Sequence, residues 1–321
     1  MIETDILVIG AGLAGLTLAQ ELSAKGTKVL LLEKSRSPGG RLSTRRSEFG
    51  SFDHGAQYLT SRTPGFTRTL NRLAETGDLA QWNPQGKDSD HPWWVGKPGM
   101  STLGKALARD LDISFETRAT RIEKQGQKFL VHTEIRSEAG PTYLASRIIT
   151  AIPAPQTNDL LGSLDPVFQR IRNVEMAPCC SAMLAFDTPL QGVPDLIRGQ
   201  DPHTLALIAR NGSKPGRSGE TFILHATPQW SRAHIESERD AVKSAMVDSF
   251  RTQTGLKGSL PAPVHCEVHR WLYALVETAL EQPFLGNPDN TLFACGDWCI
   301  GGRAEAAYQS GEALARHIIT L

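Results

Sequence analysis

The amino-acid sequence predicts an α/β protein that starts with a Rossmann-type strand–helix–strand unit, and three observations support this fold class. The apolar run Ile6–Ile9 is continuous and stops at Gly10. Apolar residues then recur at helical spacing from Leu13 to Leu22, and a second apolar run covers Val29–Leu32. Continuous apolar strands on either side of a short helix are typical of parallel strands buried on both faces and joined by a right-handed crossover.

Length, composition and charge bound the class of protein. A chain of 321 residues exceeds what one core usually organises, so we expect roughly two domains. Apolar residues make up 40% and charged residues 21%, which is ordinary for a globular protein without long disordered regions. Basic and acidic residues both number 34, so neither a nucleic acid nor an anionic membrane is an expected partner.

Cysteine usage and the first residues indicate a cellular setting. Five cysteines in a chain of this length are an odd number and form no disulfide framework, so we expect a reduced, cytoplasmic location. The most apolar stretch, Ile6–Ala19, is too short to span a bilayer, and Glu3 and Asp5 precede it where a signal peptide needs basic residues.

Later segments extend the α/β pattern. The stretch Ser35–Pro64 is rich in glycine, serine and arginine without periodicity, and a loop of that length is usually functional. We expect one helix over Ser101–Asp110 and another from about Ser237, which Ser237 would cap together with Asp240 three residues on. The apolar pattern predicts further strands at Ile113–Phe115, Arg121–Ile122, Phe129–Val131, Arg147–Ile152, Ser181–Phe186, Thr204–Ala209, Thr221–His225 and Thr291–Ala294, the last followed by a helix from Ala304.

The first turn carries a dinucleotide-binding pattern. Gly10-Ala11-Gly12-Leu13-Ala14-Gly15 places glycines for a tight turn, for close approach of the backbone to a pyrophosphate, and for packing of the helix on the strand. Glu33 ends the second strand, where its carboxylate would accept hydrogen bonds from the adenosine ribose and repel a 2′-phosphate. The pattern therefore predicts FAD or NAD rather than NADP.

Two further segments favour FAD over NAD. Gly39-Gly40-Arg41 follows the acidic strand end and would wrap the outer side of the pyrophosphate. Near the other end of the chain, Cys295-Gly296-Asp297-Trp298 and Gly301–Ala307 predict a strand, a loop and the start of a helix. The positive N-terminus of that helix would suit the charge that develops on a reduced flavin. We therefore expect the two ends of the sequence to form one cofactor site.

These motifs, together with several segments between them, resemble the flavin-containing amine oxidase superfamily, and within it the bacterial renalase branch. The resemblance covers essentially the whole chain. It rests on the segments Asp53–Tyr58, Trp94–Ser101, Ala209–Asn211 with Ser213–Pro215, His225–Thr227 with Gln229–Ser231, and His269–Ala274.

The resemblance implies a discontinuous FAD-binding domain of glutathione-reductase type with an inserted mixed-sheet substrate domain. The FAD domain would comprise residues 1–68, 97–153 and 285–321, and the substrate domain residues 69–96 and 154–284. FAD would be held non-covalently, because Ala307 stands before Tyr308 where some amine oxidases have cysteine. The implied FAD contacts are Gly10, Ala11, Gly12, Gly15, Glu33, Lys34, Gly40, Arg41, Ala56, Gln57, Tyr58, Ala119, Asp297, Arg303, Glu305 and Ala306.

The resemblance also implies a reaction. Bacterial renalases oxidise a 2-dihydro isomer of NAD(P) and pass the electrons to O₂, which becomes H₂O₂. Such a reaction depends mainly on orientation, so aromatic and polar side chains would suffice to line the pocket. The pocket candidates are Tyr58, His225, Trp230, Trp271 and Trp298. Each aromatic ring could instead fill a core, and His225 could be a structural histidine.

Two other functions stay open at this point. A true amine oxidase would need an aromatic cage, which Trp271 or Tyr273 with Trp298 could supply. A non-catalytic binding protein is the other reading, since Rab GDP-dissociation inhibitors use the same architecture; intact Glu33, Arg41 and Asp297 argue against it. No metal site is expected, because His265, Cys266 and His269 lie on an alternating strand pattern without a fourth ligand at suitable spacing.

Overall fold

The computed structural model describes residues 1–199, 204–256 and 260–321. The chain divides into two compact units, both discontinuous in sequence. Unit 1 comprises Met1–Gly40, Leu103–Met176 and Val276–Leu321, and unit 2 comprises Arg41–Thr102 and Ala177–Leu275. Compared with the expected domain ranges, residues 41–68 and 97–102 pack in unit 2, whereas 154–176 and 276–284 pack in unit 1. The assignment of these ranges to cofactor and substrate binding remains a proposal.

Unit 1 is built on a sheet whose centre is parallel. Strand β1 (Ile2–Ile9) lies between β2 (Val29–Leu32) and β11 (Tyr143–Thr150), and both pairings are parallel. On the outer sides, β7 (Asp112–Ser114) pairs with β2 in parallel, and β18 (Leu292–Ala294) pairs in parallel with the second half of β11. Antiparallel strands complete the sheet: β8 (Arg118–Gln125), β9 (Lys128–Ile135), β10 (Glu138–Ala139) and β17 (Leu285–Gly286).

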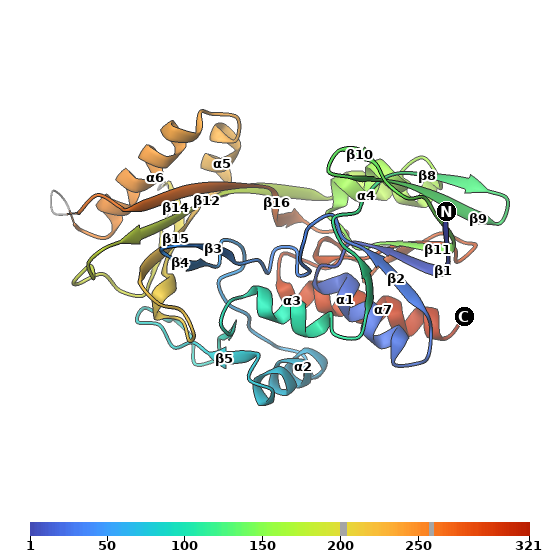
Figure 1. Ribbon diagram of the computed structural model, residues 1–321, viewed down its shortest axis with the longest axis horizontal. Coiled ribbons are helices and arrows are strands. Elements are labelled where there is room, and N and C mark those ends of the chain that lie inside the picture. Colours follow the sequence, from blue (N-terminus) through green and yellow to red (C-terminus); the bar gives the residue numbers. More distant parts are fainter. Residues whose placement is uncertain (200–203, 257–259) are drawn as a thin grey trace. The chain divides into compact units, whose positions relative to one another are not determined.

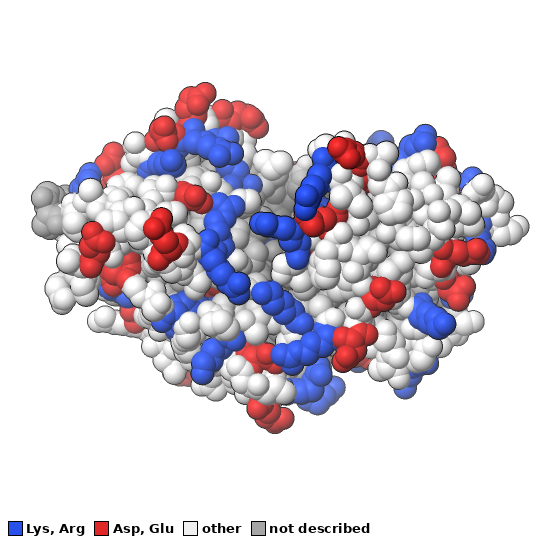
Figure 2. Space-filling view, viewed as in Figure 1, with Lys and Arg blue, Asp and Glu red and all other residues white. Residues whose placement is uncertain are grey.

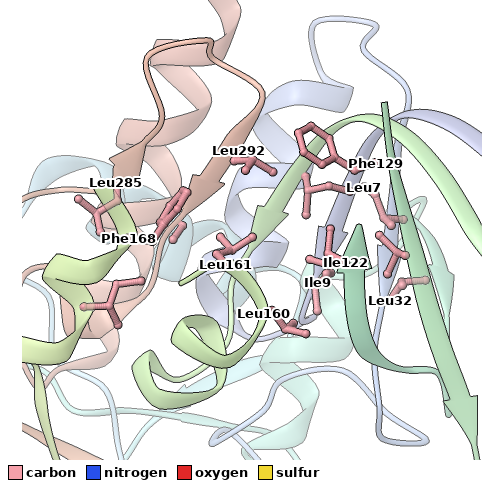
Figure 3. Close-up of a cluster of buried hydrophobic side chains, with 14 of the residues drawn as sticks. Leu7, Ile9, Leu32, Ile122, Phe129, Leu160, Leu161, Phe168, Leu285 and Leu292 are labelled. Atoms are coloured by element: carbon pink, nitrogen blue, oxygen red, sulfur yellow. The ribbon is translucent and has the colours of Figure 1, made fainter. Parts of the chain in front are cut away.

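Helices and a hairpin cover the two faces of this sheet. On one face, α1 (Leu13–Ser23) and α7 (Ala304–Ile319) pack side by side (Figure 1). On the other face, Leu7 and Ile9 of β1 join a core with α4 (Ala154–Leu161), the 3₁₀ helix η1 (Pro166–Asn173) and β8 (Figure 3). Side chains alternate along a strand, so Ile6 and Val8 point the opposite way, and they are buried too. The continuous apolar run of β1 therefore reflects burial on both faces, as predicted.

Unit 2 is built on a five-stranded sheet. Its order is β13 (Leu196–Arg198), β14 (Leu205–Arg210), β15 (Glu220–Ala226), β12 (Glu175–Phe186) and β16 (His265–Thr278). The pairings of β13 with β14, β14 with β15, and β15 with β12 are antiparallel. The remaining elements are two short hairpins and three helices with one 3₁₀ turn: β3 (Arg45–Ser47) with β4 (Gly50–Phe52), β5 (Leu79–Gln81) with β6 (Trp94–Gly96), α2 (Pro64–Glu75), α5 (Pro228–His234), α6 (Arg239–Gln253) and η2 (Asn211–Ser213).

The two faces of this sheet pack against different elements. Along β12 and β15, even-numbered side chains point to one face and odd-numbered side chains to the other. Even-numbered side chains such as Leu184 and Leu224 pack with Met246 and Phe250 of α6. Odd-numbered side chains such as Met183 and Ile223 pack with Phe52 of β4. Within β15, His225 is odd-numbered and lies directly opposite Ser181 of β12, so it belongs to the face that carries β4.

Two predicted details were wrong. Ser237 does not cap α6, because the helix begins at Arg239 after Glu238, and no side chain of the described residues caps it. The long stretch Ser35–Pro64 is not wholly irregular, since it contains the β3–β4 hairpin.

Helix α3 (Ser101–Leu107) and the 3₁₀ turn η3 (Asp297–Cys299) complete the described elements. In the described part of the chain, every helix is too short or too polar to cross a membrane.

Candidate functional site

The turn after β1 has a geometry that only glycine permits. Gly10 has φ of +108°, and a Cβ there would lie 2.6 Å from the carbonyl oxygen of Ala151. A Cβ on Gly15 would lie 2.1 Å from the carbonyl oxygen of Gly10, so this glycine lets α1 pack on the turn. A Cβ on Gly12, in contrast, would meet none of the described residues within 4 Å. The space beside Gly12 is therefore open to a ligand.

The same turn presents the N-terminus of α1. Among the described residues, no side chain caps this helix, and its first turn carries no acidic residue. The first backbone N–H groups of a helix lack partners within the helix, and its dipole makes them partly positive. An anion placed beside Gly12 would satisfy these groups, as a pyrophosphate does in dinucleotide sites.

Gly39 and Gly40 lie against this turn, and their contact with a pyrophosphate stays a prediction. The N–H of Gly39 donates a 2.8 Å hydrogen bond to the carbonyl of Ala11, and Gly12 and Gly39 form a parallel β-bridge. Both Gly39 and Gly40 have positive φ, at 116° and 55°. Arg41 begins unit 2, where its guanidinium donates to the carbonyl of Ala274.

Glu33 directly follows β2 and is 6% exposed. Its carboxylate accepts hydrogen bonds from the N–H of Ala11 at 3.0 Å and of Ser35 at 2.8 Å. A carboxylate has about four acceptor positions, so two remain for a ligand such as a ribose. The carbonyl of Glu33 also accepts from the N–H of Thr117, which places the start of β8, and with it Ala119, beside Glu33.

The C-terminal segment reaches the same edge of the unit 1 sheet. The N–H of Cys295, directly after β18, donates to Thr150 at the end of β11, and Ala151 donates to Ile9 at the end of β1. The loop after β1 and the loop after β18 therefore lie on either side of the C-terminal end of β11. Small residues let α7 approach α1, because a Cβ on Gly311 would lie 2.3 Å from the carbonyl oxygen of Ala14.

The residues at this edge fit a dinucleotide. A glycine turn with open space, an uncapped helix N-terminus and a buried acid at the next strand end match the pyrophosphate and ribose of such a ligand. Asp297 is 6% exposed at the start of η3. Arg303 and Glu305, at the start of α7, form an ion pair with a nitrogen–oxygen distance of 3.6 Å.

Unit 2 carries a cluster of ring side chains, which we call the ring cluster: His54, His225, His269 and Trp271. His54 stacks on Trp271 with ring centroids 5.3 Å apart. His269 meets His54 and Trp271 edge-on at centroid distances of 5.0 and 4.4 Å. The indole N–H of Trp271 donates to the carbonyl of His54 over 2.9 Å, which fixes the plane of the indole.

A group of buried charges adjoins the ring cluster. Asp53, Lys214 and Arg217 all have fully buried side chains, and both cations pair with the carboxylate of Asp53. That carboxylate also accepts from the hydroxyl of Thr44 at 2.7 Å and from the N–H of Met100 at 2.9 Å. Burial opposes ionisation of Asp53, but Lys214 and Arg217 outweigh it and hold its pKa below the usual value.

The three histidines of the ring cluster are uncharged at neutral pH. Burial, and then His269 and Arg45, lower the pKa of His54 to about 4. Burial and the charge of Lys214 lower the pKa of His225 to about 4, and burial and Arg45 do the same for His269. Burial also lowers the pKa of Lys214 to about 8, although Asp53 opposes this. The ring cluster is thus neutral and adjoins a buried group in which two cations share one carboxylate, and Figure 2 shows lysine and arginine side chains over the region of β3, where Arg45 pairs with Glu267.

Comparison with known proteins identifies the family. Residues 80–319, three quarters of the chain, match the family described as flavin containing amine oxidoreductase. The chain belongs to this family. Residues 8–73 also match the NAD(P)-binding Rossmann-like domain, which agrees with the glycine turn of unit 1. A flavin-dependent oxidoreductase is therefore the class to which the sequence prediction and the family both point.

Individual relatives are distant. The chain is 23% identical to human all-trans-retinol 13,14-reductase over 290 residues, which cover 83% of the chain and 46% of that protein. It is 48% identical to the Arabidopsis thaliana lysine-specific histone demethylase 1 homolog 1 over 46 residues, which cover 14% of the chain and 6% of that protein. The chain thus spans less than half the length of these curated relatives.

Solved structures of amine oxidoreductases share the fold. A triple mutant of putrescine oxidase superposes with a TM-score of 0.77 at 13% identity, with 99% of each chain covered. Wild-type putrescine oxidase bound to putrescine superposes with a TM-score of 0.71 at 14% identity, with 100% of each chain covered. At such identities the likeness shows the fold, an α/β architecture with a Rossmann-like domain, as the sequence predicts.

Two of the five predicted pocket residues need correction. Trp298 is fully buried in the unit 1 core, and its indole N–H donates to the carbonyl of Ile152 at 3.0 Å. Trp230, on α5, packs against the core on the even-numbered face of the unit 2 sheet and stacks on His234, so the sheet separates it from His225. Neither residue belongs to the ring cluster.

The other three predicted pocket residues, Tyr58, His225 and Trp271, all lie in unit 2. Trp271 and His225 belong to the ring cluster, since both hydrogen-bond to the backbone of His54. Tyr58 stacks on Trp93 with centroids 3.8 Å apart, and its hydroxyl accepts from Arg198 at 2.6 Å. The predicted FAD contacts Ala56 and Gln57 lie beside it in sequence, and their contact with the cofactor stays a prediction.

The residues of the ring cluster and the adjoining charges that were not predicted from the sequence are His54, His269, Lys214, Asp53 and Arg45. Parity along β16 could have indicated His269, because it is two positions from Trp271 and so shares its face of the strand. No local pattern distinguishes a buried lysine such as Lys214 from an exposed one. In the described part of the chain, no three His, Cys, Asp or Glu side chains are grouped as metal ligands, and the five cysteines are free thiols.

Proposed function

We propose that this chain is an FAD-dependent oxidase whose substrate is a dihydronicotinamide, namely a 2-dihydro isomer of NAD(P). Hydride leaves the dihydropyridine ring, which becomes the aromatic pyridinium of NAD(P)⁺. With one proton from solvent, O₂ takes up the two electrons and becomes H₂O₂. When bound, FAD supplies the hydride acceptor and the route of electrons to O₂.

The observation that carries this proposal is the neutral ring cluster beside a buried group in which two cations share one carboxylate. A small amine reaches an enzyme mostly as an ammonium ion, which this excess positive charge at Lys214 would repel, whereas Arg45 is paired with Glu267. Asp53 offers an ammonium no counter-charge, because Lys214 and Arg217 already pair with it. A dinucleotide brings a neutral ring and a negative pyrophosphate, so the same positive charge attracts it.

The hydrogen-bonding groups of the ring cluster also suit a nicotinamide. A neutral imidazole has one donor and one acceptor nitrogen, which complement the C=O and NH₂ of a carboxamide. The Nδ1 atom of His54 is buried and has no hydrogen-bond partner among the described residues, so it is available to a substrate. Trp271, held by its bond to His54, offers a flat surface of fixed orientation.

Unit 1 would hold FAD through the residues that the structure groups at its sheet edge. The N–H groups at the start of α1 would bind the pyrophosphate beside Gly12, and Glu33 would accept from the ribose. The proposed contacts near the flavin ring are Asp297, Arg303, Glu305 and Ala306, at the start of η3 and α7.

Anaerobic reduction tests the proposal. The purified protein should be yellow, and mixing it without oxygen with the 2-dihydro, 6-dihydro and ordinary 4-dihydro forms of NADH and with putrescine should bleach the flavin fastest with the 2-dihydro form. Admitting O₂ should restore the colour and release one H₂O₂ per substrate. Bleaching by putrescine alone would establish the amine oxidase alternative. A colourless protein that does not take up added FAD would establish a non-catalytic binding protein.

A further inference from the structure

Lys214 is a buried lysine with an unusual set of partners. Its side chain is fully buried in unit 2 directly after η2. The ammonium donates to Gln57 Oε1 at 2.9 Å, to Asp53 Oδ2 at 3.3 Å and to Asn211 Oδ1 at 3.4 Å. An ammonium has three N–H donors, so each has a partner. Two of the three, the bonds to Gln57 and Asn211, go to neutral amide oxygens rather than to the carboxylate of the ion pair.

The bond to Lys214 determines how the amide of Gln57 is oriented. A lysine can only donate, so the atom 2.9 Å from its Nζ must be the amide oxygen. The amide nitrogen then lies 2.5 Å from the carbonyl oxygen of Asp53 and 2.9 Å from that of Gly55, and both of these can only accept. All three hydrogen bonds therefore require the same orientation of the Gln57 amide.

That orientation restricts His225. The amide nitrogen of Gln57 lies 3.4 Å from Nε2 of His225. An amide nitrogen accepts no hydrogen bond, so a proton on Nε2 would find no acceptor there. A lone pair on Nε2 would instead be attracted to the two amide hydrogens and could share one that already bonds to Asp53 or Gly55. The proton of a neutral His225 is therefore favoured on Nδ1.

We infer that Lys214 is a positioning residue that, through the amide of Gln57, holds His225 in the neutral tautomer protonated on Nδ1. Among the described residues of unit 2, Lys214 makes no hydrogen bond to His225: its charge disfavours protonation of His225 directly, and its effect on the tautomer passes through Gln57. The consequence for catalysis rests on the proposed function. Loss of hydride makes the nicotinamide ring positive, and an uncharged imidazole of fixed hydrogen-bonding pattern opposes this less than an imidazolium would.

Nitrogen NMR of histidine-labelled protein tests the inference without any substrate. The ¹⁵N shifts distinguish a protonated from an unprotonated ring nitrogen, and the signals that vanish in His225→Asn identify His225. At pH 7.5 the wild-type protein should show Nδ1 protonated and Nε2 unprotonated. Lys214→Met and Gln57→Met should both produce a substantial population with the proton on Nε2.

Arg217→Met is the matched control. It also removes a buried cation from Asp53, but Arg217 bonds to Asp53 and to the carbonyls of Gly96 and Pro215 rather than to Gln57. This variant should therefore keep the wild-type tautomer. Near-UV circular dichroism on every variant checks that the tertiary fold is retained, and Gln57→Met, which leaves the three charges in place, serves if Lys214→Met does not fold.

The outcomes separate this inference from the proposed function. A wild-type His225 protonated on Nε2, or His225 signals unchanged in folded Gln57→Met, would overturn the inference whatever the substrate proves to be. If the 2-dihydro form of NADH is the substrate, Gln57→Met should lower kcat roughly ten- to hundredfold, because the pocket is misaligned. An unreactive wild-type protein with the expected tautomer would reject the proposed function and retain the inference.

Discussion

The N–H of Gly39 donates to the carbonyl of Ala11 over 2.8 Å, and this bond joins the second glycine segment to the first. The two segments are far enough apart in sequence that β2 and α1 lie between them. Their contact makes the space beside Gly12 a corner with backbone on two sides, since a Cβ on Gly40 would lie 3.5 Å from the Cα of Gly12. A ligand in this corner meets backbone rather than side chains.

Alanine should affect stability at Gly15 but cofactor affinity at Gly12. Gly15→Ala would place Cβ 2.1 Å from the carbonyl oxygen of Gly10, so we expect it to destabilise unit 1 strongly. Gly12→Ala meets no described residue within 4 Å, so the protein should fold but lose FAD affinity. Thermal melting and titration with FAD distinguish the two. A normally melting Gly15→Ala variant, or a Gly12→Ala variant with full affinity, would contradict this.

Removing the charge of Glu33 should weaken FAD binding. Glu33→Gln loses charge-assisted hydrogen bonds worth about 1.5–3 kcal/mol, which corresponds to roughly a ten- to hundredfold rise in Kd. Quenching of flavin fluorescence measures the Kd. Glu21→Gln, an exposed change on α1, is the control and should leave the Kd unaltered. Equal affinities in the two variants would remove Glu33 from the site.

Two tryptophans should respond differently to substitution by phenylalanine. Trp298→Phe leaves the carbonyl of Ile152 without its partner in a buried core, so it should lower the free energy of unfolding by about 1–3 kcal/mol. Trp271→Phe removes the bond to His54 in the ring cluster, so it should mainly raise KM for the dinucleotide. Urea unfolding and steady-state kinetics on both variants test this, and the reverse pattern would restore Trp298 as a pocket residue.

Stability should fall as the pH drops from 7 towards 5. His54, His225 and His269 have pKa values of about 4 in the folded protein, below the ordinary value of 6.5. In this window the unfolded chain therefore binds more protons, and acid favours it. The loss by pH 5 is about 1–2 kcal/mol for each histidine. Urea unfolding at several pH values measures it; His269→Gln should reduce the slope, and the exposed His91→Asn should not.

Much of unit 1 could be predicted from sequence because its signals are local. The glycine turn, Glu33 and the helix from Ala304 each occur in a short run of residues whose spacing is itself the evidence. Their meeting at one sheet edge followed from a general rule, since parallel strands bring their C-terminal ends to the same edge.

The ring cluster of unit 2 could not be predicted as a whole, because it depends on pairing between distant strands. Only the register of β12 with β15 shows that His225 faces β4, and only the position of α5 shows that Trp230 lies on the other face. The 14-residue strand β16 has no fully buried residue, so its apolar run Trp271–Val276 does not mark a buried strand. The burial of Lys214 likewise depends on Asp53 and Gln57, far away in sequence.

The protonation state of the cysteines determines how readily H₂O₂ released by such an enzyme would oxidise them. Burial raises the pKa of Cys179 and Cys295 to about 12 and that of Cys266 to about 11, and it raises the pKa values of Cys180 and Cys299 too. Peroxide attacks the thiolate rather than the thiol. An oxidase that releases H₂O₂ would therefore carry five sulfur atoms kept in their unreactive form, and repeated catalysis would leave them reduced.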